Sequence, residues 1–288
     1  MKRNAIVRII LFSLTIVILL GILITGLSAN FLSYISISDD ETATLGSAGS
    51  VNAAEVSNIS IEWAAGNIRI EPGDVTEITF AETVADEGSQ QMAWNQTGNT
   101  LHLQFSRGTI SFPSFGFSSN ISKDLVITVP RNWQCKELSI DVASADVEIL
   151  DMTVQEVDFD GASGICQFEN CIVDELSVDT ASGNIHFTGT LNVLDCDAAS
   201  ADCSIQLSNI PNRIDLDSAS GDLDLTLPEN AGFTVSMDAL SSQFTSDFPT
   251  TMSGGSYVCG DGRCRIEVDA MSGNVTIRKA TTNTDGTF

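Results

Sequence analysis

Apolar and polar residues alternate with a period of two along residues 138–277, and short Ala-Ser-Gly or Ala-Ser-Ala segments interrupt the alternation at regular intervals. The serines of these segments are 19, 19, 18, 20 and 21 residues apart from Ser144 to Ser241, and a seventh copy follows an insertion. A fixed period near twenty predicts a solenoid, because one copy cannot bury its apolar face alone. We number each copy from its serine: Ser144, Ser163, Ser182, Ser200, Ser220, Ser241 and Ser272.

Four apolar columns flank each serine, at six and four positions before it and at three and five positions after it. Only Ser246 breaks the column five positions after. Alternation on both sides of the serine predicts two short strands per copy, each with one face inward. Stacked copies would form parallel ladders about 4.8 Å apart. The expected fold is therefore all-β, a parallel β-solenoid of about 19-residue repeats over residues 134–279, with a hairpin insertion at about 249–265.

The residue after the serine is glycine in several copies, but alanine takes its place at Ala145 and Ala201. Alanine would be costly at a positive φ, so we expect a corner of limited space with ordinary backbone angles. The Asp or Asn that follows can bond to the backbone of the turn.

Residues 58–133 contain strand-like runs separated by turn signals such as Pro72-Gly73. We expect an antiparallel sheet that caps the first rung, because open solenoid ends need cover. The segment Ser111–Phe117 carries three aromatic residues. It would cover the solenoid end or contact a partner or the membrane.

The N-terminal part predicts a single membrane crossing. Residues 1–8 form a basic stub, residues 9–29 a transmembrane signal-anchor, residues 30–57 a flexible linker, and residues 280–288 a disordered tail. The uncharged run is long enough to span a bilayer, and the basic residues before it place the N-terminus in the cytoplasm. A cleaved signal peptide is the alternative, although its apolar core is usually shorter and Leu27-Ser28-Ala29 is a poor cleavage site. With either a signal-anchor or a cleaved signal peptide, the residues after about 30 lie on the outer side of the cell membrane.

The part of the chain after the basic stub is strongly acidic. The sequence has 13 Lys and Arg residues against 38 Asp and Glu residues, and three of the basic residues precede the membrane run. Such a surface repels nucleic acid and anionic headgroups. An acidic surface of this kind suits the binding of cations or basic proteins, or it simply keeps the protein soluble.

The most regular polar feature is an aspartate three positions before every serine. Lying between two inward positions, this column should point outward, where neighbouring carboxylates repel one another. It could be a solvated or hydrogen-bonded ladder, a weak calcium site, or part of a saccharide-processing surface. The solenoid signature of calcium-binding repeats is absent. The column consists of Asp141, Asp160, Asp179, Asp197, Asp217, Asp238 and Asp269.

No pattern in the sequence predicts an enzyme or a bound cofactor. A carbohydrate-active β-helix enzyme would need two acids in distinct environments, whereas this aspartate column is uniform. His102 and His186 have no nucleophile or metal-type spacing beside them, so we expect both at the surface.

Seven cysteines are compatible with export, and their odd number leaves at least one unpaired. Cys259 and Cys264 flank Gly-Asp-Gly-Arg, which predicts a hairpin closed by a disulfide. Cys196 and Cys203 flank one corner on inward positions and could also pair. Cys166 shares a column with Cys203, but two rungs separate them, about 9.6 Å, beyond disulfide reach.

The series of Ser-Gly-Asp/Asn corners, the early copy Ala65-Gly66-Asn67-Ile68, and Leu125–Pro130 before the repeats resemble the bacterial "putative adhesin" domain family of unknown function. The similarity extends over about residues 58–279 and includes autotransporter-adhesin head domains. It implies a β-solenoid at the cell surface, sometimes in membrane-anchored proteins associated with envelope stress. We therefore expect a non-enzymatic adhesin or envelope-stress accessory protein that binds an envelope protein or glycan, with calcium binding and carbohydrate chemistry as alternatives.

Overall fold

The computed structural model describes residues 43–84, 91–105 and 122–280. These residues form an 18-stranded β-structure. Among them, no helix has the length and apolar character needed to cross a membrane. The expected stub at 1–8, signal-anchor at 9–29, aromatic segment at 111–117 and tail beyond 280 lie outside the described residues.

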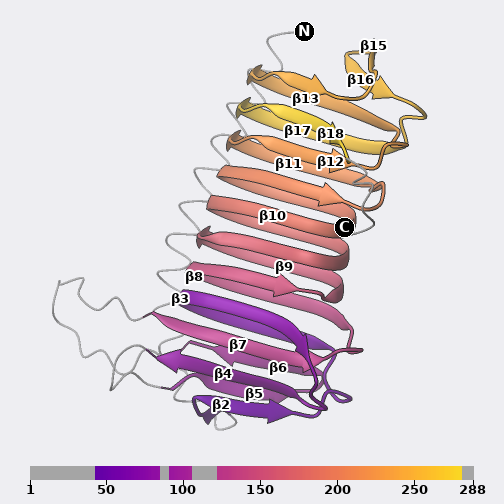
Figure 1. Ribbon diagram of the computed structural model, residues 1–288. Coiled ribbons are helices and arrows are strands. Elements are labelled where there is room, and N and C mark those ends of the chain that lie inside the picture. The colour runs from indigo at the N-terminus through magenta and orange to yellow at the C-terminus, as the bar shows by residue number, and fades with distance from the viewer. Residues whose placement is uncertain (1–42, 85–90, 106–121, 281–288) are drawn as a thin grey trace, which may run out of the picture.

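The strands of the solenoid run parallel and stack into one elongated body (Figure 1). Each coil has a first arm before its corner and a second arm after it. Several arms are continuous through the corner, so a single strand can contain two arms or more. The coil strands are β3 (Asn58–Gly73), β8 (Cys135–Leu150), β9 (Thr153–Ser163), β10 (Ile165–Leu207), β11 (Arg213–Ser220), β12 (Leu223–Leu227), β13 (Phe233–Ser241), β14 (Phe244–Ser246), β17 (Cys264–Ser272) and β18 (Val275–Lys279).

The four apolar columns form the core, as the alternation predicts. Leu138, Val157, Leu176, Leu194 and Ile214, all six positions before a corner serine, are 0% exposed. The column five positions after the serine contains adjacent aromatic rings, Phe168 and Phe187, with centroids 5.5 Å apart. Because every coil contributes the same positions, the apolar stripe of each coil is covered by the coils above and below it.

The order of the last coils differs from the order of the sequence. β17 pairs in parallel with β11 on one side and with β13 on the other. In the second arms, β18 likewise lies between β12 and β14. The last coil is thus inserted between the two coils that precede it, as Figure 1 shows at the β13 end. The repeat predicts that the coils stack in the order of the chain, and this prediction is wrong at the β13 end.

An antiparallel hairpin covers the outermost coil. It consists of β15 (Thr251–Ser253) and β16 (Ser256–Cys259), and β16 pairs with β13. Cys259 lies opposite Phe233 on one side, and Cys264 of β17 lies opposite Phe233 on the other. β13 therefore separates the two thiols by two strand spacings, about 9.6 Å. This separation is beyond disulfide reach, so the predicted Cys259–Cys264 disulfide is wrong, and both cysteines are buried free thiols.

The N-terminal cap is only partly the antiparallel sheet that was expected. The cap strands are β1 (Thr44–Leu45), β2 (Ala48–Val51), β4 (Ile78–Val84), β5 (Ala93–Thr97), β6 (Thr100–Gln104) and β7 (Lys123–Pro130). β3 is a full parallel coil that pairs with β8 along both arms. Its two arms also pair in parallel with β6 and β7 of the cap. Antiparallel pairing begins one strand further out, with β5 on β6 and β4 on β7. Residues 44–51 form strands of this cap, so the expected linker at 30–57 is wrong for that segment.

A buried ion pair joins two strands of the cap. The Nζ atom of Lys123 lies 3.0 Å from Oε2 of Glu82, and both side chains have no exposed surface. Glu82 also accepts a hydrogen bond from the backbone N–H of Met92, and Trp63 donates one to the carbonyl of Lys123. Removal of either charge would leave its partner buried without compensation, which is strongly destabilising.

The corners combine tight space with two backbone conformations. Gly183 and Gly221 have φ values of 147° and 150°, and a Cβ atom there would lie about 2 Å from the carbonyl oxygen of the preceding corner. Limited space is confirmed, whereas ordinary backbone angles are found only where alanine or serine replaces glycine, at Ala145, Ala201 and Ser242. The Asp or Asn that follows bonds to the next coil: Asp202 accepts from the N–H of Asp222, and Asp222 from that of Asn274.

Candidate binding face

The outer surface of the first arms carries a continuous row of carboxylates, which we call the acidic ladder. The register places these residues directly opposite one another on successive coils. The row follows the spatial order of the coils. Asp269 of the last coil therefore lies between Asp217 and Asp238, out of chain order. From the cap to the far end, it contains Glu62, Asp141, Asp160, Asp179, Asp197, Asp217, Asp269 and Asp238.

The ladder points outward because the residues on either side of each member point inward. Ile140 and Val142, for example, are buried on both sides of exposed Asp141. A second outward column, five positions before the corner, adds carboxylates at Asp158, Asp195, Asp215 and Glu267. Together with the ladder, these four residues make up what we call the acidic face.

Crowding alters the acidity of the ladder. Partial burial, followed by the neighbouring charges of Asp141, Asp158 and Asp179, raises the pKa of Asp160 to about 7. Burial also raises the pKa of Asp141, which lies directly opposite Asp160 on the neighbouring strand. Burial also raises the pKa of Asp197 to about 6 and that of Asp217 to about 7, with further contributions from adjacent carboxylates. Part of the ladder is therefore protonated near neutral pH.

Positive charge is found mainly at one end of the acidic face. Arg213 lies 3.2 Å from Asp195 and 2.9 Å from Asp215, so it neutralises part of the face around β11. Within the described residues, Asp141, Asp160 and Asp179 form no ion pair. The unneutralised region thus lies on β8, β9 and the first half of β10.

The face does not have the features of a metal centre or a hydrolytic cleft. Among the described residues, no group of three or more His, Cys, Asp or Glu side chains is arranged to hold a metal ion. The raised pKa values belong to repeated positions along a strand surface, rather than to one acid facing one base. The hollow lined by Asn52, Asp74, Arg131 and Trp133 belongs to the cap region. Calcium binding by the ladder stays a prediction.

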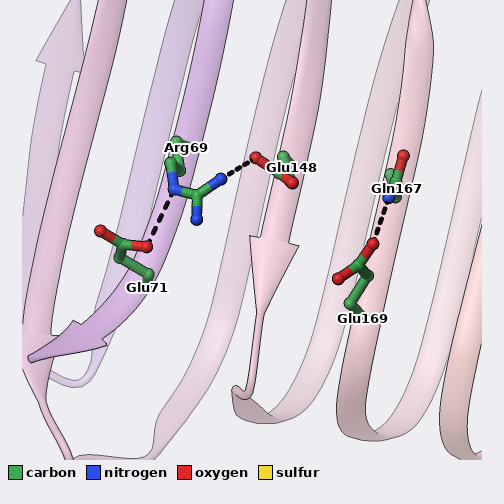
Figure 2. A network of polar contacts seen from close by, with 5 residues as sticks. All are labelled: Arg69, Glu71, Glu148, Gln167 and Glu169. Carbon is green, nitrogen blue, oxygen red and sulfur yellow. Dashed lines mark hydrogen bonds and ion pairs between the residues drawn. The ribbon is translucent and has the colours of Figure 1, made fainter.

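The outer surface of the second arms has a different character, because several of its carboxylates bond to Arg or Gln side chains. Figure 2 shows Arg69 between Glu71 and Glu148, and Gln167 donating to Glu169. His186 lies on this surface, whereas His102 lies on β6 of the cap. The two histidines are therefore on different elements, and both are only partly buried.

Two features of this region were missed by the sequence analysis. Glu62 extends the ladder into the cap, and its pKa is raised by burial. The signal was present, since Glu62 lies three positions before Ala65, the residue that aligns with Ser144. The bonding of corner Asp and Asn residues to the next coil was also missed, because the sequence suggested bonds within one turn.

The model of the family described as Toastrack DUF4097 matches residues 56–278. Solved structures with similarity include a "putative cell adhesion protein" from Clostridium sporogenes, at 11% identity, covering 81% of this chain and 98% of that chain with a TM-score of 0.39. A "putative adhesin" from Bacteroides fragilis has 14% identity, covers 84% of this chain and 98% of that chain, and has a TM-score of 0.39. A "putative lipid binding protein" from Parabacteroides distasonis has 11% identity, with the same coverages and a TM-score of 0.32. No curated protein matches the sequence.

Proposed function

This chain belongs to the Toastrack DUF4097 family, the "putative adhesin" family that its corners resemble, and we propose that it is a non-enzymatic binding scaffold. In this proposal, the solenoid presents the acidic face to a basic partner in the cell envelope. The N-terminal segment anchors the chain in the cell membrane with its N-terminus in the cytoplasm. The function is then presentation and binding, without turnover of a substrate.

The observation that carries the proposal is the unneutralised part of the acidic face. Asp141, Asp160 and Asp179 lie on adjacent coils, about 4.8 Å apart along the axis, and Asp158 lies on the same strand as Asp160. Like charges at this spacing repel by about 1 kcal/mol even in bulk water. A basic partner would relieve this repulsion on binding, and the negative potential would speed its approach.

The rigidity of the face also favours binding. Its side chains stand on strands whose backbone groups are paired to coils on both sides. A surface held in this way loses little conformational entropy when a partner binds. A flat face suits an extended or folded macromolecule better than a small substrate, which usually needs a concave site.

A comparison of charge variants tests the proposal. The face variant carries D141N, D160N and D179N, which remove charge while keeping side-chain size. The control variant carries E77Q, E169Q and D174N, which remove three exposed carboxylates outside the acidic face. Each full-length protein is immobilised and exposed to cell-envelope extract at low and high salt, and the captured proteins and glycans are quantified.

The proposal predicts a basic partner that the wild type and the control variant retain at low salt. Its capture falls at least tenfold for the face variant and at high salt. Equal capture by the face and control variants would show that this face does not bind the partner. Release of sugars from envelope polysaccharide by the wild type, and not by the face variant, would favour a carbohydrate-active enzyme instead.

The membrane anchor needs a separate measurement, because it rests on the sequence of residues 9–29 alone. Cell fractionation should place the full chain in the membrane fraction, and protease added to intact cells stripped of their wall should digest residues 43–280. Recovery of the chain in the cytosol would contradict this part of the proposal.

A further inference from the structure

Two cysteines face each other inside one coil near the middle of the solenoid. Both lie on β10, in the coil whose corner serine is Ser200. Cys196 lies in the first arm of this coil, opposite Leu216, and Cys203 lies in its second arm, opposite Leu223. Both side chains are 1% exposed. They occupy the two apolar columns nearest the corner, so both side chains point into the core just inside it.

The equivalent pair in the neighbouring coil is Val178 with Ile185, and no other coil has cysteine at both positions. In the cysteine coil, the neighbouring Cys203 side chain, followed by burial, raises the pKa of Cys196 well above its ordinary value. The corner between them holds Ala198 and Ala201, both buried. These small residues let the two arms come close together.

Two alternative pairs are excluded by their separation. Cys166 is separated from Cys203 by the coil that contains Ile185, and β13 separates Cys259 from Cys264. Cys171 contacts the carbonyl oxygens of Ile149 and Glu169. All seven cysteines lie in the described part of the chain, and each is a buried free thiol.

We propose that Cys196 and Cys203 are a modification site at which a disulfide forms across the corner of this coil. The two thiols release two protons and two electrons as the S–S bond forms. A small-molecule disulfide such as oxidised glutathione accepts the electrons, its own S–S bond breaks, and two glutathione thiols are produced. The exchange passes through a mixed disulfide with one of the two cysteines.

The bond would fasten the corner at the centre of the acidic face. Cys196 lies between Asp195 and Asp197, and Cys203 follows Asp202, which holds the N–H of Asp222 on the next coil. The bridged segment, residues 196–203, is short, so the constraint on the unfolded chain is small. The main effect is to hold the two arms together, and burial of both thiols makes formation slow.

Peptide mapping of the wild-type protein tests the site directly. The full-length protein in detergent is incubated for an extended period with oxidised and reduced glutathione, then denatured, and its remaining thiols are alkylated. Trypsin does not cut between residues 137 and 212, so a protease that cleaves before aspartate is used. The expected product links residues 195–196 to residues 202–214, with five of the seven thiols still free.

Two variants define the specificity. C203S should retain all six of its thiols after oxidation, whereas the matched control C166S, in the same column, should still lose two. Seven free thiols in the oxidised wild type would overturn the proposal, and so would a linked peptide that joins any other cysteines. The wild-type map alone decides the matter if C203S fails to fold.

Discussion

At the scale of single residues, the acidic ladder shows how a repeat changes the chemistry of an ordinary side chain. An exposed aspartate on an isolated strand would keep its usual acidity. In the ladder, Asp160 has carboxylates above, below and beside it, and its surroundings also remove part of its hydration. Both effects disfavour the charged form, so the proton is held up to higher pH.

The raised pKa values predict that the protein is more stable in mild acid than in mild alkali. The pKa of Asp160 is about 7 in the folded chain, against an ordinary value of 3.8. The folded state therefore binds more protons between these limits, and the free energy of unfolding falls as pH rises towards about 7. Thermal unfolding should give a lower Tm at pH 8 than at pH 5.

The D160N variant should weaken this pH dependence and raise Tm at pH 8 by a few degrees. Exposure and screening reduce the expected gain to about 1 kcal/mol, which corresponds to roughly 2–4 °C for a chain of this size. E77Q is the control, because Glu77 lies on the cap away from the ladder. An identical pH profile for D160N and wild type would contradict a raised pKa at this position.

A second prediction concerns the glycine corners. In G221A, the new Cβ atom would lie 1.9 Å from the carbonyl oxygen of Ala201, at a φ of 150°. Since the obstructing atom belongs to the backbone, we expect a loss of about 2 kcal/mol or more in chemical denaturation. The reverse change A201G, at a corner with an ordinary backbone angle, should cost about 1 kcal/mol or less. Equal losses would show that the two corners do not differ in this way.

At the scale of elements, the distinctive feature is the inserted last coil. β17 forms ladders with β11 and β13, so the end of the solenoid is built from coils out of chain order. The outermost coil is covered by the antiparallel β16, rather than by another repeat. This arrangement leaves the C-terminal coil with paired backbone groups on both sides.

Cysteine pairs on the acidic face can test this order. S236C with E267C should form a disulfide under mild oxidation, because the register places these residues on adjacent strands. D215C with S236C should not, because β17 separates them by about 9.6 Å, beyond disulfide reach. Mass spectrometry of the cross-linked peptides identifies the bond. The opposite result would mean that the coils stack in chain order.

At the scale of the whole molecule, net charge opposes compactness. The sequence has a formal net charge of −25, and stacking brings many of its carboxylates into rows. Salt screens such repulsion, with a Debye length that falls from about 30 Å at 0.01 M to about 3 Å at 1 M. The apolar core has to outweigh this repulsion when the chain folds.

We therefore expect Tm to rise by several degrees when sodium chloride increases from about 0.01 M to about 0.5 M at pH 8. The variant with D141N, D160N and D179N should show a smaller rise and a higher Tm at low salt. The variant with E77Q, E169Q and D174N should follow the wild type more closely. A Tm that is independent of salt would show that repulsion on the acidic face contributes little to stability.

The repeat made much of this fold accessible from sequence. Alternation placed residues such as Leu138 and Ile140 in the core, and the aspartate column placed Asp141 and Asp160 in one outward row; both placements agree with the structure. The prediction of a Cys259–Cys264 disulfide was wrong for a specific reason. Proximity in the chain suggested that the two cysteines share a hairpin, whereas a strand from elsewhere in the sequence lies between them.

The sequence by itself determined the period, the inward and outward faces of each arm, and the acidity of one face, because these follow from the alternation of side chains along each strand. Only the tertiary structure decided which coil lies beside which, where the ladder is neutralised, and which thiols meet. Any coil offers the same backbone hydrogen bonds and similar apolar columns to a neighbour, so local pattern does not specify the order of stacking. That order depends on how connections such as Pro228–Gly232 carry the chain past one rung and leave a place for the last coil.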